Sequence, residues 1–195
     1  MSLTDAAACF ADRAITLQQL RAIAPHAPGS HLDFINAAMA AHEVNTPRRQ
    51  AAFLAQVMFE CNQGREFVEE ASGAAYEGRR DLGNTQPGDG PRFKGRGAIQ
   101  LTGRTNYTRA SGALGVDFVA HPDWAAEPRW AYEVAGWYWH SRGLNDLADA
   151  GDFESITKRI NGGLGGYSVR LEFYARAARA LGCVPESGGQ SGEGA

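Results

Sequence analysis

The sequence predicts a mostly α-helical domain that is interrupted by one long, glycine-rich loop region and contains minimal β-structure. Apolar residues recur every three or four positions in several segments, which is the period of an amphipathic helix. Of the 24 glycines, 17 lie in residues 64–103, 162–166 and 188–194, which marks specific loops. Of the 195 residues 44% are hydrophobic and 21% charged, so we expect one domain, residues 1–185, and a disordered tail, residues 186–195.

The first two predicted helices cover residues 16–24 and 30–43. Thr16 is a suitable N-cap for the first helix, whose leucines and isoleucine fall on one side. The second helix is expected to begin with a capping box formed by Ser30 and Asp33, with aspartate in place of the usual glutamate.

Residues 46–62 give the clearest helix signal. Thr46 is a favourable N-cap, and Pro47 occupies the first helical position, where its missing N–H costs little. Gly64 is expected to end this helix. Residues 64–98 are then polar and glycine-rich, and so long an irregular span inside a compact domain is more often functional than filler.

The second half of the chain is predicted to be helical again. Residues 99–113 are expected to begin with a short strand or turn and then become helical. Residues 128–142 carry aromatic side chains at helical spacing, which favours packing in the core over stacking on a ligand. The last two helices are expected at 152–160, with Asp152 as N-cap, and at 167–181.

Charge and cysteine content weigh against several classes of protein. The net charge of −3 is unlike the basic footprint of nucleic-acid binders. Three cysteines without a CxxC pair indicate neither a disulfide framework nor a zinc site, and the histidines show no metal-ligand spacing. No apolar stretch approaches membrane-spanning length. The N-terminus lacks a signal-peptide pattern, so we expect synthesis in the cytoplasm and release by another route.

Glu60 is the first candidate for catalysis. It lies near the end of the apolar helix 46–62, where burial and the negative end of the helix dipole would both favour the protonated carboxyl. That property suits a general acid. The alternative is a solvated glutamate at a frayed helix end.

Glu69 is the second candidate. It lies among other glutamates in residues 65–70, so a solvated charged face is the default interpretation. The functional interpretation places its carboxylate across a cleft from Glu60, because glycoside hydrolysis needs one acid and one base or nucleophile.

Two further segments carry polar groups that fit a sugar. In residues 94–107, Gln100, Thr102 and Tyr107 offer amide and hydroxyl groups, and the glycines would let the backbone approach a ligand closely. An ordinary half-buried strand is the alternative there. In residues 160–170, two Gly-Gly pairs follow an asparagine, and this stretch is equally compatible with a simple helix-to-helix turn.

Taken together, AAFLAQVMFE, GRGAIQLTGRTNY and INGG with the following arginine resemble glycoside hydrolase family 19, in order over residues 30–182. This family holds chitinases and a branch of peptidoglycan-cleaving endolysins. The intervening ASGAAYEGRRDLGNTQPGDG is similar to the endolysin branch.

The resemblance implies a two-lobed, lysozyme-like α-helical fold and inverting hydrolysis of the β-1,4 bond between N-acetylmuramic acid and N-acetylglucosamine, without a metal or cofactor. Glu60 matches the general acid, Glu69 the general base, and Thr102 the hydroxyl that helps to hold the attacking water. The positions that match cleft residues, which bind sugar or position the carboxylates, are Gln100, Tyr107, Asn161 and Arg170.

Two departures from the family pattern flank the proposed acid. Phe59 stands where histidine is usual, and Cys61 stands where serine or threonine is usual. These departures favour a non-catalytic glycan-binding or interaction protein as one alternative, and a chitinase of the same fold is the other. The expected partner is the peptidoglycan glycan strand, acted on by a monomer after holin- or secretion-dependent release. An immunity protein is expected only if the chain is a delivered toxin.

Overall fold

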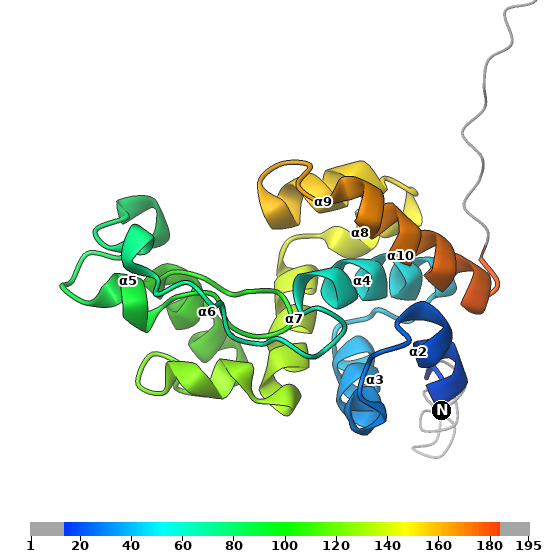
Figure 1. The fold of residues 1–195 in the computed structure, drawn as a ribbon, viewed down its shortest axis with the longest axis horizontal. Coiled ribbons are helices and arrows are strands. Elements are labelled where there is room, and N and C mark those ends of the chain that lie inside the picture. The colour runs from blue at the N-terminus through cyan, green and yellow to red at the C-terminus, as the bar shows by residue number, and fades with distance from the viewer. Residues whose placement is uncertain (1–13, 184–195) are drawn as a thin grey trace, which may run out of the picture.

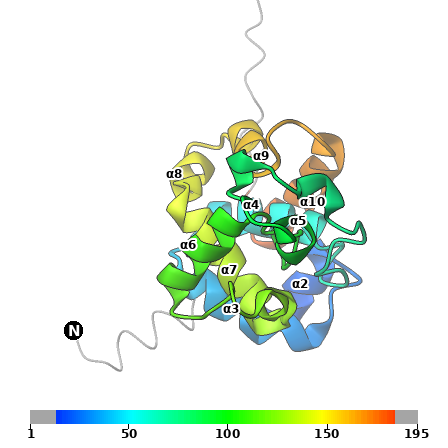
Figure 2. The ribbon, with the colours of Figure 1, turned by 90° about the vertical axis from the view of Figure 1, so that its left-hand side faces the viewer.

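The computed structural model describes residues 14–183, which form two lobes joined by a long helix (Figure 1). The helical lobe contains α2 (Leu17–Ile23), α3 (Leu32–Ala41), α4 (Pro47–Glu60), α8 (Leu144–Asp149), α9 (Phe153–Asn161) and α10 (Tyr167–Ala180). The loop lobe, residues 65–127, contains α5 (Asp89–Arg92) and α6 (Arg104–Leu114), and Figure 2 shows it in front. The joining helix is α7 (Pro128–Ser141), which contacts α3 and α8 on one side and α6 on the other. The predicted two-lobed, mostly helical fold is confirmed.

Helices begin where the sequence offers a capping side chain. The Thr16 hydroxyl accepts a hydrogen bond from the backbone N–H of Gln19, whose side chain accepts one from Thr16 in return. The side chains of Thr46 and Asp152 cap α4 and α9 in the predicted manner. Each cap satisfies an N–H group that the helix itself leaves without a partner.

Other predicted helix limits were wrong. Residues Gly29–His31 form a 3-10 turn, and α3 begins at Leu32 with no side-chain cap, so the predicted capping box of Ser30 is absent. The third helix ends at Glu60 instead of residue 62, because the backbone turns left-handed at Asn62 and stays so through Gly64, the predicted stop. Consecutive residues with positive φ cannot continue a right-handed helix.

Of the short strand or turn predicted near residue 99, the structure shows a turn at residues 97–100, flanked by isolated bridges. Val68 pairs with Arg96, and Arg96 pairs with Leu101, both antiparallel. These bridges hold three extended segments of the loop lobe side by side. Within residues 14–183 no regular strand is present, as the minimal β-content predicted.

α4 is the central helix of the helical lobe. Residues 51–58 are all buried, and the helix packs against α10 and α8. The rings of Phe53 and Trp139 meet edge to face at 5.4 Å. The aromatic residues on α7 were predicted to pack in the core, and this is confirmed for Trp139, which is buried. The other three are only partly buried against the core: Trp130, Trp137 and Tyr138.

The described residues, 14–183, offer neither a membrane-spanning helix nor a cluster of metal-binding side chains. None of the helices within residues 14–183 combines the length and apolar character that a membrane crossing requires. The same part of the chain holds no group of three or more His, Cys, Asp or Glu side chains that could bind a metal ion. The predicted tail, residues 186–195, lies outside the described residues.

Gly136 permits the close crossing of α7 over α3. A Cβ at this position would collide with the His42 ring and lie 3.1 Å from the Ala38 carbonyl oxygen. We expect Gly136→Ala to destabilise the protein by about 1–3 kcal/mol, because overpacking forces the two helices apart. The unfolding temperature should fall by about 2–12 °C, measured by circular dichroism.

Gly112 on α6 supplies the matched control. It lies in a helix but has open space where a Cβ would be. Gly112→Ala should raise stability by about 0.5–1 kcal/mol, because alanine favours the helix. Equal effects of the two substitutions would contradict the close α3–α7 crossing.

Candidate functional site

Glu60 and Arg170 form an ion pair between the end of α4 and α10. Arg170 donates from Nη2 to Glu60 Oε1 at 2.5 Å. The Arg170 side chain is 1% exposed and that of Glu60 is 15% exposed. Glu60 therefore reaches the surface while the group that orients it does not. The structure brings these two predicted site residues together.

Arg170 is held by contacts from α4 and from the loop that precedes α10. Its Nη1 donates to Gln56 Oε1 at 2.5 Å, and its Nε donates to the carbonyl oxygen of Gly165 at 3.1 Å. Gln56 in turn donates to the Thr157 hydroxyl at 2.8 Å. Arg170 and Gln56, which supply the donors of this network, are buried, so the network can orient the Glu60 carboxylate but is not exposed to a ligand. Gln56 and Thr157 were missed by the sequence reasoning.

The two departures from the family pattern have structural roles. The Arg170 guanidinium stacks over the Phe59 ring, with its Cζ atom 4.1 Å from the ring centroid. The same ring packs against Gly166. Cys61 is buried, its thiol donates to the Val57 carbonyl oxygen, and burial raises the pKa of this thiol to about 12. The thiol therefore stays neutral, and its sulfur accepts a hydrogen bond from the Gly64 N–H just beyond the helix.

Glu69 belongs to the loop lobe and is firmly anchored despite its irregular surroundings. Its backbone N–H donates to the Gly95 carbonyl oxygen, and its Oε2 accepts from the Gly95 N–H, both at 2.9 Å. The Tyr76 hydroxyl donates to the other carboxylate oxygen at 2.9 Å. Lys94 donates from Nζ to the Glu69 carbonyl oxygen. The carboxylate retains further acceptor positions, since a carboxylate has about four.

Gln100 lies beside Glu69, and Thr102 contacts the backbone of Gln100. A side chain at Gly95 would meet Gln100 Oε1 at 2.8 Å and Glu69 Oε2 at 3.1 Å, so both oxygens occupy the space above this glycine. The Thr102 hydroxyl donates to the Gln100 carbonyl oxygen at 2.9 Å, which leaves its lone pairs available to a water molecule.

Two of the glycines in this segment do not serve the predicted approach to a ligand. A Cβ at Gly97 would lie 2.7 Å from the Ala125 carbonyl oxygen, and one at Gly103 would lie 2.7 Å from the Leu82 carbonyl oxygen. These positions are covered by the protein's own backbone. Their glycines are therefore required by packing within the loop lobe.

Tyr107 and Asn161 differ in their access to a ligand. Tyr107 is completely buried, its hydroxyl donates to the Lys94 carbonyl oxygen, and burial raises its pKa to about 12. It supports the backbone that leads into Gly95 and cannot touch a sugar here. Asn161 is the last residue of α9 and is exposed, so its amide can meet a ligand.

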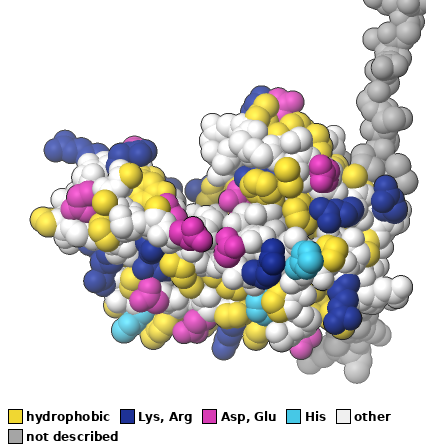
Figure 3. Space-filling view, viewed as in Figure 1, with side chains coloured by type: hydrophobic (Ala, Val, Ile, Leu, Met, Phe, Trp, Pro, Cys, Tyr) yellow, Lys and Arg dark blue, Asp and Glu magenta, His cyan; other side chains and the backbone are white. Residues whose placement is uncertain are grey.

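The two lobes enclose a notch that is visible in the space-filling view (Figure 3). Asp or Glu side chains show on both sides of it, and Lys or Arg side chains show at its floor. Glu60 belongs to the helical lobe and Glu69 to the loop lobe. The geometry therefore offers one carboxyl from each lobe, which is the requirement for two-carboxylate chemistry on a chain bound between them.

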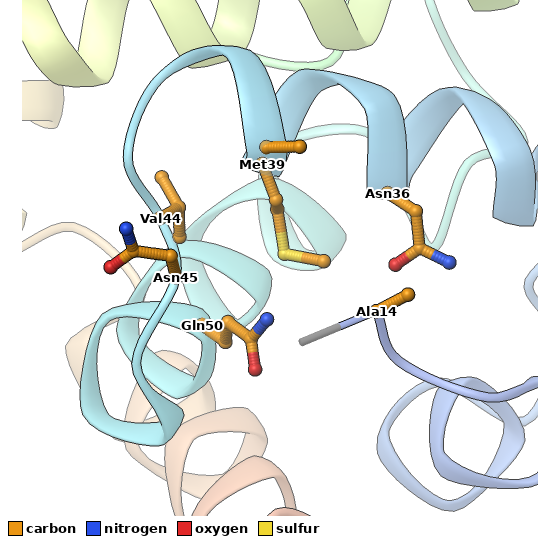
Figure 4. Close-up of a pocket in the computed structure, with 7 residues that line it drawn as sticks. Ala14, Asn36, Met39, Val44, Asn45 and Gln50 are labelled. Atoms are coloured by element: carbon orange, nitrogen blue, oxygen red, sulfur yellow. The ribbon is translucent and has the colours of Figure 1, made fainter. Parts of the chain in front are cut away.

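A small cavity of about 30 Å³ lies between α3 and the start of α4 (Figure 4). Met39, Val44 and Gln50 are among the residues that line it. Gln50 and Glu60 are ten positions apart on one helix, which separates them by about 15 Å. This cavity is therefore distinct from the notch.

A family sequence model and several individual proteins match this chain. Residues 29–149 match the sequence model of the family described as Chitinase class I. A glycosyl hydrolase family 19 domain-containing protein of Haemophilus influenzae is 37% identical over 99 residues, which cover 51% of this chain and 48% of the relative. An endochitinase of Arabidopsis thaliana is 33% identical over 162 residues, which cover 78% and 56%. The chain thus spans about half the length of these relatives.

Solved structures show the same fold. A bacterial family 19 chitinase superposes with a TM-score of 0.75 at 25% identity, covering 88% of this chain and 97% of that one. Chitinase C from Streptomyces griseus superposes with a TM-score of 0.76 at 22% identity, covering 89% and 78%.

Proposed function

The chain belongs to glycoside hydrolase family 19, and from this premise we propose that it hydrolyses a β-1,4-linked N-acetylhexosamine polymer with inversion. The observation that carries the proposal is the pair of anchored glutamates, one from each lobe. Glu60 is oriented by Arg170, and Glu69 is oriented by Gly95 and Tyr76. Fixed carboxyl groups of this kind are what an acid and a base on opposite faces of a sugar require.

In the proposed mechanism each carboxyl has one role. Glu60 protonates the glycosidic oxygen as the bond to the anomeric carbon breaks. Glu69 removes a proton from a water molecule that attacks the opposite face, and the Thr102 hydroxyl helps to hold that water. Single displacement by water inverts the configuration at the anomeric carbon.

For the substrate we propose peptidoglycan, with cleavage between N-acetylmuramic acid and N-acetylglucosamine. The loop of residues 71–90 supports this choice through its resemblance to the endolysin branch. Chitin is the second candidate, supported by the endochitinase among the relatives and by the chitinases of the same fold. The two polymers share the β-1,4 backbone and the acetamido groups, so one pair of glutamates can serve either.

Glu69→Gln tests the proposed base. We expect turnover to fall by about 10²–10⁴-fold, because glutamine cannot accept the proton of the attacking water. The neighbouring Glu70→Gln is the matched control, since Glu70 is exposed and should leave the rate unchanged. Rates are measured as reducing sugar released from purified murein and from soluble chitin oligomers.

Mass spectrometry of the digested murein identifies the bond. New reducing ends on muramic acid would support the proposed cleavage. Hydrolysis of chitin oligomers without action on murein would select the chitinase. Glycan binding without any turnover, unchanged by Glu69→Gln, would select the non-catalytic alternative and contradict the proposed mechanism.

A further inference from the structure

Three side chains on one face of α4 contact Arg170 of α10, the helix that packs beside it (Figure 1). Gln56, Phe59 and Glu60 have the spacing i, i+3 and i+4, which places them next to one another on a helix. Gln56 and Glu60 each accept a hydrogen bond from the Arg170 guanidinium. The Arg170 Cζ atom lies over the Phe59 ring, 4.1 Å from its centroid. Phe59 therefore touches the group that orients the proposed acid.

The Phe59 ring and the hydrogen bonds restrain Arg170 in different directions. The N–H groups of a guanidinium point outward in its plane, so its acceptors lie around its edge. These acceptors are Gln56 Oε1, Glu60 Oε1 and the Gly165 carbonyl oxygen. They resist sliding of the guanidinium within its plane. The Phe59 ring covers one of its faces and opposes displacement out of the plane on that side.

Gly166 makes room for the Phe59 ring. It is the N-cap of α10 and has a left-handed backbone, with a φ angle of 67°. A Cβ at this position would collide with the tip of the Phe59 ring, so the ring occupies the space of the missing side chain. The Gly166 carbonyl oxygen accepts a hydrogen bond from the Arg170 N–H, one helical turn further on. The ring is therefore held between the start of α10 and the Arg170 guanidinium.

We propose that Phe59 is a positioning residue for the reaction, and that it acts through Arg170 to hold the Glu60 carboxyl where it can protonate the glycosidic oxygen. This inference rests on the proposed function and adds a residue to its machinery. Proton transfer requires the carboxyl within hydrogen-bond reach, so a small misplacement lowers the rate steeply. Phe59 stands where the family usually has histidine, and its apolar ring adds a restraint without competing for the hydrogen-bond acceptors of Arg170.

Phe59→Leu tests the proposal by the kinetics of the full chain. Leucine is apolar but offers no flat face to the guanidinium. On whichever of murein and chitin oligomers the wild-type protein hydrolyses, kcat should fall by about 10–100-fold. KM should stay unchanged, because the groups that bind the sugar are still present. Phe59→His should keep kcat close to the wild-type value at a pH of about 8, where a histidine of ordinary pKa, about 6.5, is neutral and offers a flat ring.

Phe173→Leu is the matched control for Phe59→Leu. The Phe173 ring lies beneath the guanidinium of Arg176, whose Cζ atom is 4.3 Å from the ring centroid, on the same helix as Arg170. Arg176 donates to the Glu172 carbonyl oxygen and not to the proposed acid. Phe173→Leu should therefore lower the unfolding temperature, because a buried ring is lost, and leave kcat of the folded protein unchanged.

Gly166→Ala displaces the Phe59 ring without altering its chemistry. The added methyl group would take the place of the ring tip, so the ring must move and kcat should fall. Gly143→Ala is the matched control, because Gly143 is also a left-handed N-cap, of α8, with a φ angle of 62°. Beyond its chain neighbours, a Cβ there would meet no atom closer than 3.9 Å. Both substitutions strain the backbone, but only Gly166→Ala should lower kcat.

Wild-type kcat in Phe59→Leu and Gly166→Ala, beside an inactive Glu60→Gln, would overturn the positioning role and leave the proposed acid intact. An equal loss in Phe173→Leu and Gly143→Ala would overturn it as well, because general loosening would then be the cause. So would a Phe59→His variant as slow as Phe59→Leu. Absence of turnover in the wild-type protein, or full turnover in Glu60→Gln, would instead contradict the proposed function. The two failures are therefore distinguishable.

Discussion

Glu60→Gln is expected to lower turnover by about 10²–10⁴-fold while the fold remains intact. Glutamine has the same size and keeps an oxygen that can accept the hydrogen bond from Arg170, which measures 2.5 Å in the wild-type protein. It has no acidic proton to give to the leaving oxygen, so the bond to the anomeric carbon must break without assistance. The rate of reducing-sugar release from murein and from chitin oligomers measures the effect.

Glu66→Gln is the control for this substitution. Glu66 is an exposed glutamate whose carboxylate accepts a hydrogen bond from the Asn62 side chain at 2.5 Å. Its replacement removes one negative charge near the same site without touching Arg170, so the rate should change by less than about twofold. Wild-type turnover in Glu60→Gln, beside an active parent protein, would place the general acid elsewhere.

Elements with strong local signals could be predicted from the sequence. Thr16, Thr46 and Asp152 cap helices through contacts within three residues, which a sequence displays directly. The short helices α5 and α8 were missed, because a helix of four or six residues is stabilised by its surroundings more than by its own sequence. Ser30 carries a valid capping pattern, but the 3-10 turn after Pro28 replaces it.

The site was predictable only in part, because residues distant in the sequence orient its side chains. Glu60 is conspicuous because it follows an apolar helix, yet its orientation depends on Arg170, which lies 110 positions further along the chain. Gln56 offered a usable signal: it is a polar residue within an apolar run, one turn before Glu60. Tyr107 was a misleading signal. Its aromatic hydroxyl suits a sugar, but the side chain is buried and donates its hydrogen bond to the Lys94 carbonyl oxygen.

Arg170→Met should have the largest effect on stability. Methionine fills much of the volume but leaves Gln56, the Gly165 carbonyl and the Glu60 carboxylate without their donor. Loss of one partner of a buried ion pair costs about 3–5 kcal/mol. Thermal unfolding should therefore begin about 6–20 °C lower, since each kcal/mol shifts the midpoint by about 2–4 °C in a chain of this size.

Arg176→Met on the same helix isolates the contribution of the network. Arg176 also stacks on an aromatic ring, Phe173 at 4.3 Å, but it has only a long hydrogen bond to the Glu172 carbonyl oxygen. Its replacement should cost less than about 1 kcal/mol. A loss as large as that of Arg170→Met would show that stacking, rather than the contacts to Gln56 and Glu60, stabilises α10.

The double variant Arg170→Met, Glu60→Gln separates charge from positioning. A neutral pair at a buried site is less costly than one uncompensated charge, so adding Glu60→Gln should recover part of the lost stability. Turnover should stay as low as in Glu60→Gln alone, because the acidic proton is still missing. A double variant less stable than Arg170→Met would mean that Arg170 does not compensate the charge of Glu60. In that case its proposed role in orienting the acid would fail, even if both single variants were inactive.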